Sequence, residues 1–172
     1  MELRAVNFVI LAAVGALFLA SGTQREHAVI SDGKTDSVRA LEADYATKSN
    51  DAVSLAALMQ GYIDAQAPGL AIAAVESADP QIQGAPKVQH TYARALVEAG
   101  RANEALAAEQ RVLDTCAAQE GACDSWLIAS ATRRSDIMRQ MVSLGIEDAQ
   151  AYPEASAIAY ASATREARLV VR

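Results

Sequence analysis

The chain has 172 residues, of which 52% are hydrophobic and 5% aromatic, and its formal net charge is −6 at pH 7. This length accommodates one compact domain with an extension. Alanine, the strongest helix former, supplies much of the apolar fraction, so we expect an all-α fold. The acidic balance argues against nucleic acid as a partner, because phosphate binding requires clustered Lys and Arg side chains.

Residues 1–22 have the pattern of an export signal or a membrane anchor. An apolar run from Ala5 to Ala20 follows the positive charges of Arg4 and the amino terminus. The run is longer than many signal-peptide cores but shorter than a comfortable span of about 20 residues, and Ala20-Ser21-Gly22 is a passable cleavage site. Either interpretation exports the rest of the chain, because the positive flank stays in the cytoplasm. We favour an uncleaved single-pass anchor, whose large apolar side chains are Phe8, Ile10, Leu11, Leu17, Phe18 and Leu19.

Residues 23–36 have the composition of a linker and precede a helical domain predicted over residues 37–172. Asp36 is predicted to cap a short lead-in helix that begins at Ser37. Further helices are expected where capping residues and prolines precede apolar residues at helical spacing. Their predicted ranges are about 51–66, 68–79, 86–100, 102–114, 125–144 and 153–170, with a loop at 81–85.

Two stretches of the chain echo each other 34 residues apart. Leu55, Leu58, Met59, Tyr62, Ala71 and Ala78 correspond to Gln89, Tyr92, Ala93, Leu96, Ala105 and Val112. This period, with small and apolar residues at these offsets, is typical of stacked helical hairpins. Residues 52–118 resemble two tetratricopeptide repeats, and the segment from Thr91 to Leu106 resembles that family most closely.

The resemblance has departures. No tryptophan opens either unit, Met59 and Ala93 replace the usual glycine, and Glu109 occupies a place where a large apolar residue is usual. Trp126 lies 37 residues after Gln89, so three residues are inserted before an irregular third hairpin. A divergent last hairpin suits a capping role, because a terminal repeat needs one face in water. We therefore expect a short array of about three hairpins behind the anchor helix.

The resemblance implies a concave groove formed by the first helix of each hairpin. Arg94 and Lys87 would meet an acidic peptide there, although the positions do not reproduce the clamp that some family members use for a terminal carboxylate. The alternative is that these positions are simply exposed. The matching positions are Val53, Ala56, Gln60, Ile63, Asp64, Lys87, His90, Arg94, Val97 and Glu98.

Cys116 and Cys123 lie in the inserted segment, and we predict a disulfide between them because the domain is expected to be exported. Their spacing fits neither a zinc site nor a haem attachment motif. The sequence contains no glycine-rich phosphate loop, no His-Glu-x-x-His and no Gly-x-Ser-x-Gly motif. We therefore expect no enzymatic activity, no cofactor and no metal.

These patterns together suggest a scaffold that mediates protein–protein contacts. The favoured hypothesis is an accessory subunit of a larger membrane complex, held in the bacterial inner membrane by a single span with its C-terminal domain in the periplasm. The alternative is a soluble periplasmic adaptor that binds peptides after cleavage of the N-terminal segment.

Overall fold

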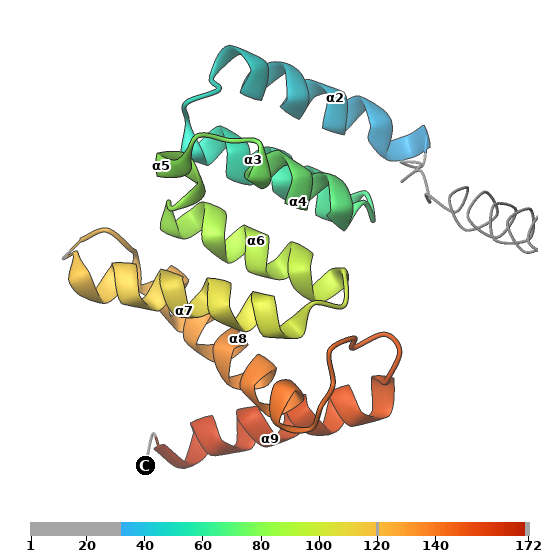
Figure 1. Ribbon diagram of the computed structural model, residues 1–172, viewed down its shortest axis with the longest axis vertical. Coiled ribbons are helices and arrows are strands. Elements are labelled where there is room, and N and C mark those ends of the chain that lie inside the picture. Colours follow the sequence, from blue (N-terminus) through green and yellow to red (C-terminus); the bar gives the residue numbers. More distant parts are fainter. Residues whose placement is uncertain (1–31, 120, 171–172) are drawn as a thin grey trace, which may run out of the picture.

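Residues 32–119 and 121–170, which the computed structural model describes, form eight helices and no strand (Figure 1). The all-α class predicted from the composition is therefore confirmed. The helices are α2 (Asp32–Thr47), α3 (Ala52–Asp64), α4 (Pro68–Glu76), α5 (Pro80–Gln83), α6 (Pro86–Glu98), α7 (Ala102–Ala118), α8 (Ser125–Ser143) and α9 (Pro153–Val170).

Local sequence explains most of the helix boundaries. The Asp51 carboxylate accepts hydrogen bonds from the backbone N–H groups of Val53 and Ser54, which makes it the N-cap of α3. Proline occupies the first position of α4, α5, α6 and α9, where its missing N–H group is not needed. Gly100 follows α6 with a φ of 73°, the left-handed conformation that favours glycine at the end of a helix.

The predicted start of the lead-in helix is wrong. α2 begins at Asp32, so Asp36 lies inside the helix, where its carboxylate pairs with Arg39 at 3.0 Å instead of capping. The Lys34 ammonium donates to the backbone carbonyl oxygen of Asp64, which connects the first turns of α2 to the end of α3. The composition of residues 32–36 suggested a linker because composition contains no information on the contact between Lys34 and Asp64.

Two later boundaries also differ from expectation. The predicted loop at 81–85 contains the one-turn helix α5, because Asp79 caps the N–H group of Gln81 at 2.8 Å. Helix α7 continues to Ala118 instead of ending near residue 114, so Cys116 lies in its last turn.

The helices pack mainly against their neighbours in the chain. α2 packs on α3, α3 packs on α4 and α6, and α6 packs on α4 and α7. α8 then packs between α7 and α9. The result is a stack elongated along the direction in which the helices follow one another (Figure 1).

The largest apolar cluster lies between α3, α4, α6 and α7 and includes the fully buried side chains of Leu55, Met59 and Leu96. Met59 and Ala93, which replace the glycines of the repeat pattern, are both completely buried. Small side chains let the helices approach closely, which is why alanine dominates the remaining contacts; the fully buried alanines of this cluster are Ala71, Ala93, Ala95, Ala105 and Ala108. A smaller cluster that includes Met141 and Ala159 joins α8 to α9.

Cys116 and Cys123 form the predicted disulfide, with their Cα atoms 5.4 Å apart. Both cysteines pack against a cluster formed by Val112, Leu127 and Ala131. The disulfide therefore links the end of α7 to the segment that leads into α8.

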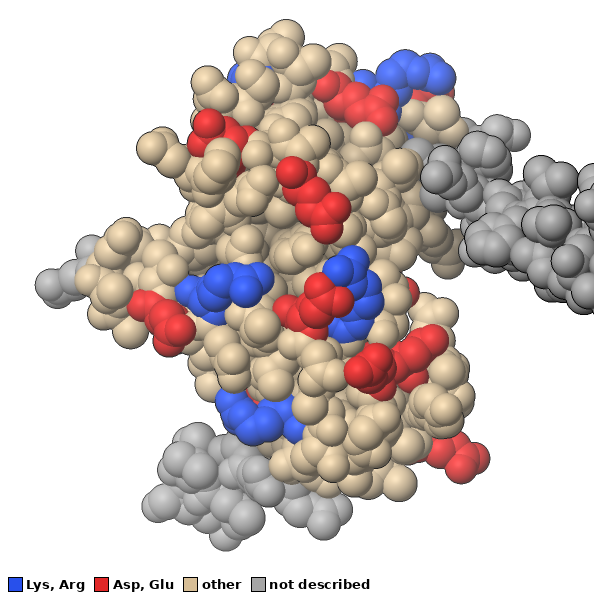
Figure 2. Space-filling view, in the orientation of Figure 1, with Lys and Arg blue, Asp and Glu red and all other residues tan. Residues whose placement is uncertain are grey.

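None of the helices in the described residues is long and apolar enough to cross a membrane. The predicted anchor, residues 1–22, lies outside the described residues, as does the predicted linker up to residue 31. The face drawn in Figure 2 carries acidic and basic side chains close together, without an extended patch of either sign.

Candidate binding groove

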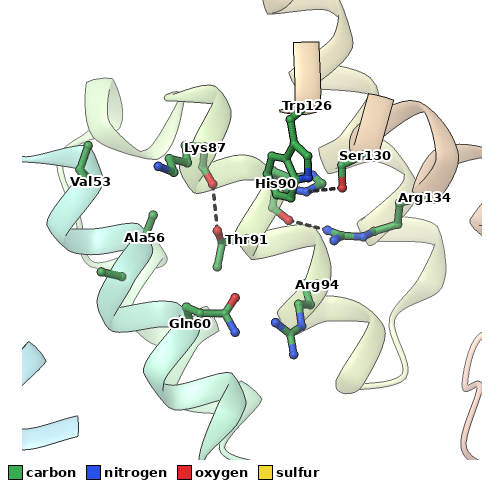
Figure 3. A pocket seen from close by; sticks show the side chains of 11 residues that line it. Val53, Ala56, Gln60, Lys87, His90, Thr91, Arg94, Trp126, Ser130 and Arg134 are labelled. Atoms are coloured by element: carbon green, nitrogen blue, oxygen red, sulfur yellow. Dashed lines mark hydrogen bonds between the residues drawn. The ribbon is translucent and has the colours of Figure 1, made fainter. Parts of the chain in front are cut away.

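A groove with a volume of about 450 Å³ lies across α3, α6 and α8 (Figure 3). Each helix contributes residues that are three or four positions apart, which places them on one helical face. The lining residues are Val53, Ala56, Ala57 and Gln60 from α3, Lys87, His90, Thr91 and Arg94 from α6, and Trp126, Ser130 and Arg134 from α8.

The lining forms three rows that run across the helices. In Figure 3, Val53, Lys87 and Trp126 lie toward one end of the groove. Ala56 and Thr91 lie in the middle, level with the guanidinium group of Arg134, and Gln60 and Arg94 form the row at the other end. One end therefore presents large apolar groups and an ammonium, and the other presents a guanidinium group and an amide. The second guanidinium group, that of Arg134, lies between them on the α8 side.

A buried ion network lies beneath the α6–α8 side of the groove. Glu109 of α7 is completely buried, and its carboxylate lies 2.9 Å from Nδ1 of His90 and 2.8 Å from Nη1 of Arg134. The same Nη1 donates to the backbone carbonyl oxygen of His90 at 2.8 Å. A buried carboxylate is tolerated only with such partners, so the network joins α6, α7 and α8.

Burial lowers the pKa of the Arg134 guanidinium, and the Glu109 carboxylate opposes that shift. Arginine nevertheless remains protonated in proteins, so the pair is ionic. Nδ1–H of His90 donates to the Glu109 carboxylate, which can only accept, and Nε2 lies 3.1 Å from the Ser130 hydroxyl oxygen. The Trp126 ring meets His90 edge-on, with ring centroids 6.0 Å apart.

Ser130, His90 and Glu109 are joined by hydrogen bonds in the same order as the nucleophile, base and acid of a catalytic triad. Two features argue against that chemistry. Ser130 lies within α8, beyond the free N–H groups of its first turn, so neighbouring backbone donors are engaged in the helix instead of forming an oxyanion hole. Arg134 also neutralises Glu109 directly, which weakens its support of an imidazolium. We interpret the trio as structural support for the groove wall.

Charged groups at the groove are paired to different extents. Arg94 forms ion pairs with Asp64 at 3.4 Å and with Glu98 at 3.3 Å, and Gln60 donates to Asp64 at 2.7 Å. The Lys87 ammonium has no ion-pair partner among the described residues. In the same part of the chain, no group of three or more His, Cys, Asp and Glu side chains could hold a metal ion.

The structure brings most of the predicted groove residues together. Gln60, Lys87, His90 and Arg94 line the groove, as do Val53 and Ala56. Asp64 and Glu98 lie at its edge, held by Arg94.

Two predicted groove residues belong elsewhere. Ile63 is only 2% exposed and lies in the core, because it follows Met59 by one turn on the packed face of α3. Val97 is half-buried against the same core.

Sequence reasoning missed the contribution of α8, namely Trp126, Ser130 and Arg134, and the role of Glu109. The irregular spacing of the third hairpin concealed the α8 residues. The signal for Glu109 was present, because a carboxylate at a position where an apolar residue is expected needs a buried partner.

Comparisons with protein-family models, with curated proteins and with solved structures gave no match for this chain. The fold and the groove therefore define its class by themselves. The described residues form an all-α protein whose helices stack in chain order and whose α3, α6 and α8 present an open groove.

Proposed function

We propose that this chain is a tetratricopeptide-like scaffold that binds a segment of a partner protein in the groove of α3, α6 and α8. The main support for this proposal is the exposure of Trp126. Its side chain is 67% exposed, although its ring contacts the imidazole of His90, which hydrogen bonds hold in place. Exposed aromatic side chains on a rigid base are typical centres of binding energy in protein interfaces.

The order of packing supports the repeat resemblance. α3, α6 and α8 would be the first helices of three hairpins, with α4, α7 and α9 as their partners. α6 lies between α3 and α7, and α4 packs on it from the preceding hairpin. Stacked hairpins of this kind generally provide a binding surface instead of a reaction centre.

The proposed setting is the periplasmic side of a bacterial inner membrane, where the chain would be an accessory subunit of a larger membrane complex. The disulfide between Cys116 and Cys123 supports an oxidising compartment. The apolar run from Ala5 to Ala20 supports attachment to the membrane.

Purification of the tagged full chain from its native membranes in mild detergent tests the proposal. We expect one partner to co-purify in a fixed ratio and to be lost from the Trp126→Ala variant. Tyr152→Ala is the matched control, because Tyr152 is an aromatic residue of similar exposure, 59%, outside the groove. A chain that elutes alone, or a partner that both variants retain, would contradict the proposal.

The alternative, a cleaved periplasmic adaptor for peptides, gains support from the third helix of the groove. With α8 the groove spans three hairpins instead of two, which lengthens the surface available to a peptide. The two functions share the groove and differ in whether the N-terminal segment remains attached.

A further inference from the structure

The two ends of the groove differ in chemistry, and this difference restricts what can bind. At one end Trp126 and Val53 are 67% and 59% exposed and offer apolar surface. Arg94 offers a guanidinium group at the other end, where it also pairs with Asp64 and Glu98, and Arg134 offers a second one nearer the middle. No Asp or Glu side chain is among the described residues that line the groove, although the whole chain has a net charge of −6.

Arg134 retains a hydrogen-bonding edge for a ligand. Its Nη1 group is engaged by Glu109 and by the carbonyl of His90, whereas its Nε and Nη2 groups make no hydrogen bond to the described residues. The Nε–Nη2 edge of a guanidinium matches the two oxygens of a carboxylate. Because the buried pair with Glu109 fixes this side chain, little of its conformational freedom is lost on binding.

The distance between the two ends of the groove sets the distance between the two ligand groups that bind there. Lys87 and Arg94 mark the end rows on α6 and are seven residues apart, which corresponds to about 10 Å along a helix. A peptide segment in the polyproline II conformation rises about 3.1 Å per residue and has three residues per turn, so the same distance corresponds to roughly three residues whose end side chains lie on one face. The small side chains of the middle row leave room for the intervening backbone.

We propose that the groove recognises an extended internal segment of its partner that carries a large apolar residue and an Asp or Glu about three positions apart. The apolar side chain packs on Trp126 and Val53, and the carboxylate binds Arg134 and Arg94. This inference rests on the proposed function and adds the chemistry of the ligand to it.

Selection from a random heptapeptide library tests the proposal. The peptides are displayed with their C-termini fused to the coat protein, so that only side-chain carboxylates are available. We expect the folded domain to enrich peptides in which Trp, Phe or Leu is about three positions from Asp or Glu. Enrichment without an acidic residue would overturn this inference and leave the proposed function intact, whereas no enrichment of any peptide would contradict both.

Substitutions in the groove test which side chains contribute to the binding of a selected peptide. For a selected peptide synthesised with an amidated C-terminus, Trp126→Ala should weaken binding at least about tenfold, as expected for a central aromatic contact. Tyr152→Ala should leave it unchanged. Arg94→Glu should weaken the same peptide and, when the library is selected again, favour Lys or Arg in place of the acid.

Arg139→Glu is the matched control for Arg94→Glu, because Arg139 is an exposed arginine of α8 that also pairs with a carboxylate but does not line the groove. Its selected peptides should match those of the unaltered domain. Circular dichroism spectra confirm that each variant is folded. Equal effects of Arg94→Glu and Arg139→Glu would mean that general charge, and not the groove, sets the preference, and would overturn the inference.

Discussion

Glu109 is the residue that departs most from the proposed repeat pattern. The repeat pattern expects a large apolar side chain there, yet the carboxylate is completely buried between His90 and Arg134. A buried ion pair adds little net stability compared with apolar packing, but the loss of one partner is costly because it leaves a buried charge. The network thus fixes Arg134 and His90 beside the groove.

The Glu109→Ala variant should lower the free energy of unfolding by about 3–5 kcal/mol, because it leaves Arg134 without its buried counter-ion. The double variant Glu109→Leu with Arg134→Met should cost less than this single change, because it removes both charges. Urea denaturation followed by circular dichroism measures both. A double variant that is less stable than Glu109→Ala would mean that the ion pair itself stabilises the fold.

Ser130 should not react as an activated nucleophile, although its hydroxyl lies 3.1 Å from Nε2 of His90. Helix α8 offers no backbone oxyanion donors around it, so we expect no labelling of purified protein by a fluorophosphonate probe. Peptide mass spectrometry after labelling is the measurement, with a known serine hydrolase as the positive control. Modification of Ser130 that disappears in His90→Ala would refute the structural interpretation of this trio.

At the scale of elements, capping residues and prolines set most helix boundaries, while contacts with other helices lengthen some helices beyond them. Pro68, Pro86 and Pro153 begin helices as predicted, whereas α2 and α7 are longer than their local sequence suggested. The additional turns coincide with tertiary features, namely the contact of Lys34 with α3 and the packing of Cys116 beside α8. Packing, and not intrinsic propensity, supplies most of the stability of such turns.

Replacement of both Cys116 and Cys123 by serine should lower the free energy of unfolding by about 2 kcal/mol, as expected for a disulfide that closes a short loop. Urea denaturation with and without a reductant measures the loss. Reductant should destabilise the natural chain and leave the double variant unchanged. Free thiols detected by alkylation in protein isolated from the periplasm would contradict the assigned disulfide.

Tyr62 joins α3 to α2 through a hydrogen bond of 2.7 Å to Glu42. Burial and this carboxylate raise the pKa of Tyr62 from 10.0 to about 12. The folded state therefore favours the neutral phenol, and this contribution to stability is complete below pH 10 and lost as the pH rises through about 12. Tyrosinate absorbance should show one group ionising near pH 12 that is missing from Tyr62→Phe. Identical titration curves would exclude the shift.

At the scale of the whole molecule, the described helices form a short array that α2 covers at one end and α9 at the other. This arrangement gives a bounded groove instead of a long superhelix. The third hairpin does more than close the array, because α8 supplies Trp126 and Arg134 to the groove. The sequence prediction assigned this hairpin a capping role and did not place its residues in the groove.

The N-terminal segment decides between the two proposed settings. For a retained anchor we expect intact mass spectrometry of the native protein to give the full chain of 18.1 kDa, recovered in the membrane fraction. A mature chain that begins near Thr23 and is released with the periplasmic contents would support the soluble adaptor and reject the anchored subunit. Expression of residues 23–172 alone provides the size standard.

The sequence by itself determined the helical class, most helix boundaries, the cysteine pair and most of the α3 and α6 positions that line the groove. These features follow from local capping and from periodicity, which a chain carries within each segment. The tertiary structure alone decided that α8 completes the groove and that Glu109 forms an ion pair with Arg134 and a hydrogen bond with His90. The contact between His90 and Glu109 joins residues 19 positions apart, and those of α8 with Glu109 and His90 join residues 25 to 44 positions apart across the inserted segment, so no local pattern identifies these partners.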